Sequence, residues 1–258
     1  MNTRRRLLER LVVAPGQAAG IAARDPGWTG GDEFPDLAAD ELAQRAKDAI
    51  TAGVAELSEA QELLWASDRY ALLVVLQAMD AAGKDSVIKH VMSGVNPQGV
   101  QVVSFKRPSS EELGHNYLWR ISNALPGRGR IGIFNRSHYE EVVALKVHPE
   151  WLAPQRLPPG ERDEAFWQER YEDINAFERH LDRNGTKIVN FFLHVSMAVQ
   201  RSGSSRGSTA PARNGNPTRP TSPSGLTSMI TYALSKMRSR PPRRRGHPGT
   251  SSPPTTGG

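Results

Sequence analysis

The chain has 258 residues, enough for one domain with a sizeable hydrophobic core. It contains no cysteine, which excludes disulfides, thiolate catalysis and thiolate-bound zinc. Residues 202–258 hold nine of the 33 basic residues and none of the 27 acidic ones, so the net charge of +6 becomes −3 over residues 1–201. A basic charge spread over the whole protein, as in many nucleic-acid-binding domains, is therefore excluded.

The first residues combine basic and apolar side chains. Arg4, Arg5 and Arg6 precede a run of leucine and valine that Glu9 and Arg10 interrupt. A signal peptide needs an unbroken apolar core, so the pattern predicts a short amphipathic helix and a cytoplasmic protein. No apolar run reaches the length that crosses a membrane, and no membrane partner is expected. Glycines and prolines then predict irregular structure up to about residue 31.

Apolar residues recur three or four positions apart from Asp40 to Ala66, which predicts helical structure. Ser58-Glu59-Ala60-Gln61 fits a capping box, so a second helix is expected to begin at Ser58. Together with the first short helix, these segments form a predicted helical extension over residues 1–68.

The stretch from Gln77 to Ser86 is the most informative part of the chain. It follows an apolar run, 71–76, within a strand predicted over 71–77 and expected to be buried on both faces, and it precedes residues 86–92, which have helical spacing. A strand, a loop of small residues and a helix form the arrangement of a phosphate-binding loop. Backbone N–H groups, the helix dipole and Lys84 would attract phosphate oxygens there.

The loop departs from the usual pattern of Gly, four residues and Gly-Lys-Ser/Thr. Ala78 replaces the first glycine, and Asp85 follows Lys84. Asp80 lies within the loop, where a carboxylate among phosphates makes sense only beside a cation such as Mg²⁺. The alternative is a strand-to-helix turn that Asp80 or Asp85 caps, without any phosphate.

Strands and helices alternate along the rest of the body. The predicted elements are a strand over 100–105, a helix from Ser109 or Ser110 to about Ala124, a strand over 130–134, a helix over 161–184 and a strand over 186–193. Residues 141–160 contain four prolines and predict an excursion that could serve as a mobile lid. The alternation predicts a three-layer α/β fold with a mainly parallel sheet.

Three segments besides the loop carry a resemblance to a known family. They are Phe105-Lys106-Arg107-Pro108, Phe134-Asn135-Arg136-Ser137-His138-Tyr139-Glu140 and Asn190-Phe191-Phe192-Leu193-His194-Val195-Ser196. In this order and spacing they resemble the polyphosphate kinase 2 family over residues 25–201. The resemblance implies a P-loop fold similar to thymidylate kinase, with a lid and Mg²⁺. It also implies phosphoryl transfer between inorganic polyphosphate and a nucleoside mono- or diphosphate. The loop and residues 91–99 are most similar to members that accept the adenine nucleotides AMP and ADP.

The resemblance and the chemistry together assign residue roles, because phosphoryl transfer depends on positioning and charge neutralisation. The predicted catalytic residues are Asp80, Lys84, Asn135 and Arg136, with Asp80 as the Mg²⁺ ligand. The predicted nucleotide-phosphate residues are Ala82, Gly83, Lys84, Asp85 and Ser86. The predicted polyphosphate residues are Lys106, Arg107, Arg120 and Lys146. Many members have aspartate where this chain has Asn135, and an amide binds a hard cation more weakly than a carboxylate.

Some of these residues also have a simpler interpretation. Arg120 fits a solvated helix charge about as well as a polyphosphate ligand, and the role of Lys146 depends on the lid. His138 is interpreted as a packing histidine. Asn190 stands where relatives often have lysine, which puts a cationic role at that position in doubt.

The resemblance ends near Arg201, which bounds the predicted kinase domain at residues 1–201. Residues 202–258 are rich in Ser, Pro, Gly, Thr and Arg, which is typical of a disordered basic tail. In codons shifted by one base, three parts of this tail can encode segments similar to the family's carboxyl-terminal ones; they are residues 202–209, 228–231 and 246–258. We therefore hypothesise a one-base frameshift near residues 199–202.

A frameshift would remove a basic lid helix, another helix and the last strand. One sheet edge and several apolar helix faces would then lack partners, so the chain as written is expected to be poorly stable and weakly active or inactive. Three functions follow from the sequence, of which a polyphosphate-dependent nucleotide kinase is favoured. The others are an ATP-using kinase of the same fold and a nucleic-acid binder acting through residues 202–258. The family also implies a homo-oligomer, either a dimer or a tetramer, and no nucleic-acid partner.

Overall fold

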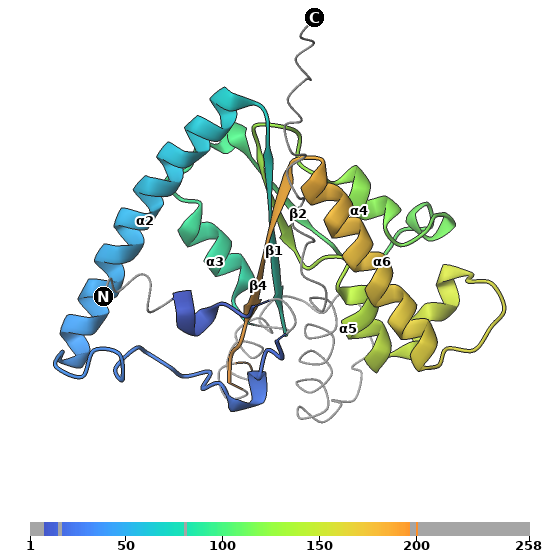
Figure 1. Cartoon of the computed structure of the whole chain (residues 1–258), viewed down its shortest axis with the longest axis horizontal. Helices are drawn as coiled ribbons and strands as arrows, with labels where there is room; N and C mark the ends of the chain where they lie inside the picture. Colours follow the sequence, from blue (N-terminus) through green and yellow to red (C-terminus); the bar gives the residue numbers. More distant parts are fainter. Residues whose placement is uncertain (1–7, 15–16, 80–81, 197–199, 201–258) are drawn as a thin grey trace, which may run out of the picture.

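A four-stranded parallel sheet forms the centre of the structure (Figure 1). The computed structural model describes residues 8–14, 17–79, 82–196 and 200. The strands are β1 (Ala71–Ala78), β2 (Val100–Ser104), β3 (Ile131–Asn135) and β4 (Thr186–Leu193), and their order in the sheet is β2-β3-β1-β4. The predicted parallel α/β sheet is confirmed, and every predicted strand is present.

β1 is a central strand, with β3 on one side and β4 on the other. Leu73 and Val75, which share one face, are fully buried, whereas Leu72 and Val74 on the opposite face are only partly buried, so the predicted burial is complete on one face only. The register places Leu76 opposite Asn135 in β3 and opposite Phe191 in β4. The carboxyl ends of β1 and β3 therefore lie side by side, at the edge where open α/β sheets bind their ligands.

Helices cover both faces of the sheet. In Figure 1, α2 (Ala39–Ser67) and α3 (Lys84–Val91) lie on one side, and α4 (Trp119–Asn123), α5 (Glu140–Val147) and α6 (Glu164–Arg183) lie on the other. The 3-10 helices are η1 (Ile21–Ala23), η2 (Pro97–Gly99), η3 (Glu112–Gly114) and η4 (Pro149–Gln155). Within the described part of the chain, no helix is both long enough and apolar enough to span a membrane.

The main hydrophobic core lies between the sheet and α6. Tyr171 and Ile174 face inward from α6 and are fully buried, as is Phe134 from β3. Ile21 of η1 belongs to the same core cluster, so the irregular amino-terminal segment also packs against the body. Each large apolar side chain buried in this way contributes about 1.5–3 kcal/mol.

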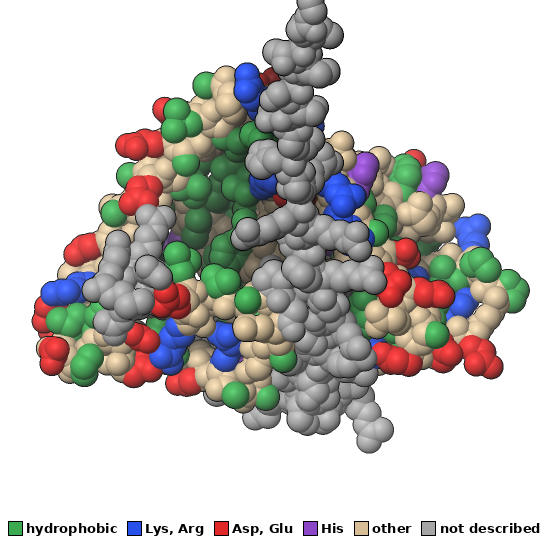
Figure 2. Space-filling model, viewed as in Figure 1, with side chains coloured by type: hydrophobic (Ala, Val, Ile, Leu, Met, Phe, Trp, Pro, Cys, Tyr) green, Lys and Arg blue, Asp and Glu red, His purple; other side chains and the backbone are tan. Residues whose placement is uncertain are grey.

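α2 packs against the body mainly through a narrow stripe. Gln61 is its buried residue and lies against Gly99 of η2, whereas Ile50 and Leu63 are exposed. Figure 2 shows apolar side chains in the hollow between α2 and the sheet, and acidic side chains along the outer side of α2. Apart from Gln61, α2 therefore buries no residue fully.

Two predicted helix boundaries are wrong. α2 continues through Ser58 without a break, because the capping-box pattern there has no glycine or proline beside it to interrupt the helical hydrogen bonds. The predicted helix from Ser109 to Ala124 is also absent as one unit. Ser109 and Glu112 do form a capping box, at 3.2 and 2.7 Å, but η3 ends after one turn and His115 is extended. α4 begins only after that extended segment.

Residues 141–160, predicted as an excursion, are mostly helical. They contain most of α5 and all of η4. Leu145 and Leu152 are buried in the main core, so both helices are packed against the body in this structure. Whether this segment moves as a lid remains a prediction.

Glycine substitutions test the packing at the centre of the sheet. A Cβ atom at Gly132 in β3 would lie 2.8 Å from the ring of Pro126, so Gly132→Ala should lower the free energy of unfolding by about 1–3 kcal/mol. Gly53 in α2 has open space around it, and Gly53→Ala should raise the same free energy by about 0.5–1 kcal/mol. Urea unfolding measures both, and equal effects of the two substitutions would contradict this packing.

Candidate functional site

The loop between β1 and α3 forms the first part of the candidate site. Gly83 has a φ of 79°, in the left-handed region that glycine adopts without steric cost, and α3 begins directly after it at Lys84. The first N–H groups of a helix have no partner within it, and together with the helix dipole they favour a phosphate group. Asp80 and Ala81 lie outside the described residues, so the role of Asp80 stays a prediction.

Lys84 lies folded against the loop. Its ammonium donates hydrogen bonds to the carbonyl oxygens of Ala78 at 3.3 Å and Met79 at 3.2 Å. The residue is only 9% exposed. The carboxyl end of β1 therefore fixes the lysine in place at the start of α3, where its positive charge adds to that of the helix dipole.

A side-chain hydrogen bond joins this loop to the end of β3. The Nδ2 atom of Asn135 donates to Oδ1 of Asp85 at 2.6 Å. Asp85 and Ser86 are exposed on the first turn of α3, whereas Ala82 is buried. The predicted phosphate-binding residues and Asn135 are thus brought together at one edge of the sheet.

Arg136 lies beside them, directly after β3. Its φ of 65° is in the left-handed region, which is unusual for arginine. Its backbone N–H donates to the carbonyl oxygen of Leu76 in β1, at 3.1 Å. Its guanidinium is 42% exposed and lies 3.8 Å from the carboxylate of Glu140, which also accepts a hydrogen bond from Gln77. The turn after β3 is therefore tied to β1 by backbone and side chain.

A cavity of about 480 Å³ opens beside this turn. Lys106 and Arg107, which follow β2, line it together with Arg136. Tyr117 and Trp151 add aromatic surface to its wall. Four of the predicted functional cations, Lys106, Arg107, Arg120 and Arg136, therefore line one cavity, at the carboxyl ends of β2 and β3.

The other two predicted polyphosphate residues are held by partners within the protein. Arg120 donates to the carbonyl oxygen of Lys106 at 2.9 Å and lies 3.5 Å from the carboxylate of Glu112. Lys146 forms an ion pair with Glu164 at 2.9 Å. Their side chains are 11% and 15% exposed. Arg120 still lines the cavity, whereas Lys146 does not, so a polyanion could reach Lys146 only after its ion pair opens.

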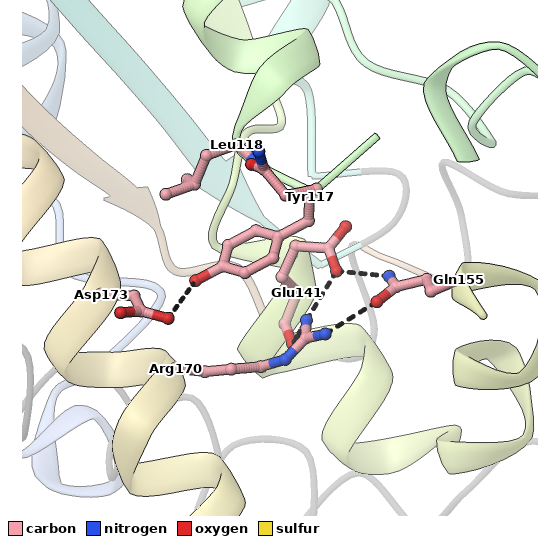
Figure 3. Close-up of polar contacts among 7 residues, drawn as sticks. Tyr117, Leu118, Glu141, Gln155, Arg170 and Asp173 are labelled. Carbon is pink, nitrogen blue, oxygen red and sulfur yellow. Dashed lines mark hydrogen bonds and ion pairs between the residues drawn. The ribbon is translucent and has the colours of Figure 1, made fainter. Parts of the chain in front are cut away.

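Sequence reasoning missed a buried arginine between α5 and α6. Arg170 donates to Glu141 at 2.9 Å and to Gln155 at 2.7 Å, beside a second cavity of about 460 Å³ (Figure 3). Tyr117 lines the same cavity and its hydroxyl faces Asp173, at 3.5 Å. Burial and the Asp173 carboxylate raise the pKa of Tyr117, which keeps its hydroxyl protonated. The signal that could have found Arg170 is a charged residue within the apolar stripe of α6.

A second polar cluster that the sequence did not indicate lies beneath the turn after β3. Glu178 of α6 accepts a hydrogen bond from the hydroxyl of Tyr139, and its carboxylate lies 3.2 Å from Nε2 of His138. Asn190 of β4 donates to the same hydroxyl, at 2.8 Å. His138 is 1% exposed, which agrees with its interpretation as a packing histidine. Burial raises the pKa of Glu178, but His138, Tyr139 and Asn190 outweigh that effect and lower it.

Comparisons with known proteins identify the family. The family described as Polyphosphate kinase 2 matches residues 41–216, which is more than half of the chain. The chain belongs to the polyphosphate kinase 2 family. The resemblance inferred from the loop and the three segments is thereby confirmed.

Relatives within the polyphosphate kinase 2 family share long stretches of sequence with this chain. The ADP-polyphosphate phosphotransferase of Rhodopseudomonas palustris is 57% identical over 149 residues, which cover 57% of this chain and 52% of that protein. The AMP/ADP-polyphosphate phosphotransferase of Meiothermus ruber is 46% identical over 158 residues, which cover 61% of this chain and 55% of that protein. The chain thus spans about half the length of these curated relatives.

A solved structure supports the same family fold. The crystal structure of Polyphosphate Kinase 2 from Arthrobacter aurescens TC1 is similar with a TM-score of 0.63 and 28% sequence identity. The similarity covers 90% of this chain and 82% of that one. The P-loop kinase-like fold that the family resemblance implied is therefore confirmed.

The carboxylate of Glu178 gives the stability of the fold a testable dependence on pH. Because its folded-state pKa lies below the ordinary 4.5, its ionised form stabilises the fold above that pH, and the contribution is lost as the pH falls through the folded pKa. Glu178→Gln should therefore lower the free energy of unfolding by about 1–3 kcal/mol at pH 7 and by less at pH 3.5. Urea unfolding at both pH values measures this, and a difference that grows at pH 3.5 would contradict it.

Proposed function

We propose that this chain transfers a phosphoryl group between inorganic polyphosphate and a nucleoside mono- or diphosphate. The observation that carries the proposal is the hydrogen bond from Asn135 to Asp85, which joins the phosphate-binding loop to the loop that holds Arg136. Lys84 and Arg136 thus belong to one edge of the sheet, which is the arrangement that a transferring phosphoryl group requires.

The proposed chemistry needs no covalent intermediate. A terminal phosphate oxygen of the nucleotide attacks the terminal phosphorus of polyphosphate, a new P–O–P bond forms, and the polymer leaves one unit shorter. Lys84 and the N–H groups of α3 hold the nucleotide phosphates, and Arg136 stabilises the charge that develops on the transferring group. Lys106 and Arg107 contact the polymer where they line the cavity. Arg120 lines the same cavity, and Lys146 joins them only if its ion pair with Glu164 opens.

The side chains present suit a Mg²⁺ ion. Mg²⁺ in phosphoryl-transfer sites is held by one or two carboxylates together with substrate phosphates, rather than by a cage of protein ligands. Asp85 supplies a carboxylate and Asn135 an amide oxygen at this edge, and Asp80 is the further proposed ligand. The described residues contain no group of three His, Asp or Glu side chains that would form a complete cage. When bound, Mg²⁺ would neutralise phosphate charge and orient the reacting groups.

Adenine nucleotides are the proposed acceptors. The Rhodopseudomonas palustris relative is named for ADP, and the Meiothermus ruber relative is named for both AMP and ADP. We include both nucleotides in the proposal, in agreement with the loop sequence. A cytoplasmic location, assembly as a dimer or tetramer, and the kinase-domain boundary at residue 201 belong to the same proposal and rest on the sequence. The frameshift hypothesis concerns residues 199–258, of which only Gln200 is described.

A lysine pair on α3 tests the proposal directly. Lys84→Ala should lower polyphosphate-dependent formation of ATP from ADP by about 10²–10³-fold, because it removes a charge that faces the phosphates. Lys89→Ala, an exposed lysine on the same helix, should leave the rate unchanged. Luciferase detection of ATP measures the rate on the full 258-residue chain.

Two further measurements distinguish weak turnover from a missing binding site, and polyphosphate from ATP as the phosphate donor. Calorimetric titration with tripolyphosphate shows whether the site exists when turnover is weak, as the frameshift hypothesis predicts. Equal loss of binding in Lys84→Ala and Lys89→Ala would contradict the assigned role of Lys84. Transfer from ATP to a small molecule, with no response to polyphosphate, would favour the ATP-using kinase instead.

A further inference from the structure

Arg136 holds a backbone conformation that needs external support. A non-glycine residue in the left-handed region costs about 1–2 kcal/mol relative to its ordinary conformation. Such a conformation persists only where the surrounding structure fixes it, and it is often found where a side chain must be aimed at a ligand. The contacts that hold the turn after β3 therefore determine where the guanidinium of Arg136 lies.

The turn is closed first by its own hydrogen bonds. Ser137 accepts from the backbone N–H of Tyr139 through its hydroxyl, at 3.2 Å, and from Glu140 through its carbonyl, at 3.1 Å. His138 and Tyr139 are 1% and 3% exposed, so both side chains point into the protein while Arg136 stays partly exposed. The turn is thus anchored by the two residues that follow Ser137.

Glu178 is the common partner of these two anchors. Its Oε1 atom is 2.5 Å from the hydroxyl of Tyr139 and 3.2 Å from Nε2 of His138. Asn190 lies 3.4 Å from the same carboxylate oxygen, so α6, β4 and the turn meet at a single atom. Shielding a carboxylate from water costs free energy unless hydrogen-bond donors surround it. The partners of Glu178 meet this requirement, so they hold its carboxylate in one position.

We propose that Glu178 is a positioning residue that places Arg136 for phosphate binding, acting through His138 and Tyr139. Glu178 does not itself line the cavity beside Arg136, so it is not a catalytic residue. The inference rests on the proposed function, because that function assigns Arg136 to the transferring phosphate. It adds a residue of α6, outside the cavity, to those that determine the position of Arg136.

A double-mutant cycle tests the inference. Calorimetric titration with tripolyphosphate at pH 7 compares wild type, Arg136→Ala, Glu178→Gln and the double variant. Each single substitution should weaken binding about tenfold. The double variant should show about the same tenfold loss, because Glu178 affects binding only by positioning Arg136. Glu172→Gln, at an exposed position on α6, is the matched control and should bind as wild type does.

Urea unfolding of each variant shows whether a loss of binding reflects a loss of folding. Tyr139→Phe retains the ring and removes only the hydroxyl, so it serves as a second variant if Glu178→Gln fails to fold; it should weaken binding and add nothing to Arg136→Ala. A folded Glu178→Gln that binds as wild type does, or losses that multiply to about a hundredfold in the double variant, would overturn the inference. Wild type that does not bind tripolyphosphate would remove the proposed function and this inference together, whereas multiplied losses in a binding protein would remove only the inference.

Discussion

The register between β1 and β3 is the constraint on which the site depends. It sets Leu76 opposite Asn135, so the loop after β1 and the turn after β3 start from neighbouring points. The backbone N–H of Arg136 then donates to the carbonyl oxygen of Leu76, and this bond extends the pairing one residue beyond the strand. A slip of the register by one residue would shift the turn after β3 along β1 and would turn the side chains of the strand to the opposite face.

The same turn connects the sheet to α6. His138 and Tyr139 reach inward to Glu178, while Arg136 remains at the surface beside the cavity. The core around Tyr171 and Ile174 fixes α6 against the sheet and so fixes Glu178 as well. Packing far from the phosphate-binding loop thereby contributes to the geometry of the site. Among the described strands, β4 lies at an edge of the sheet, and its Phe191 is 50% exposed.

β1, β3 and the two loops could be predicted from sequence, because a central strand reads as a nearly continuous apolar run and polar residues follow its carboxyl end. The break at Ser58 was predicted wrongly, since a capping box also occurs inside a continuous helix. The role of Glu178 could not be predicted, because its partners are 12 to 40 residues away and only the tertiary fold brings them together. For the same reason, the sequence does not predict that Arg120 pairs with Glu112 or that Lys146 pairs with Glu164.

The loop after β1 and the turn after β3 should bind one ligand together. Hydrogen exchange with and without ADP and magnesium, followed by mass spectrometry, tests this claim on the full chain. We expect slower exchange in both segments, residues 76–92 and 131–140. Slower exchange confined to the second cavity, at residues 112–117 and 166–173, would contradict it.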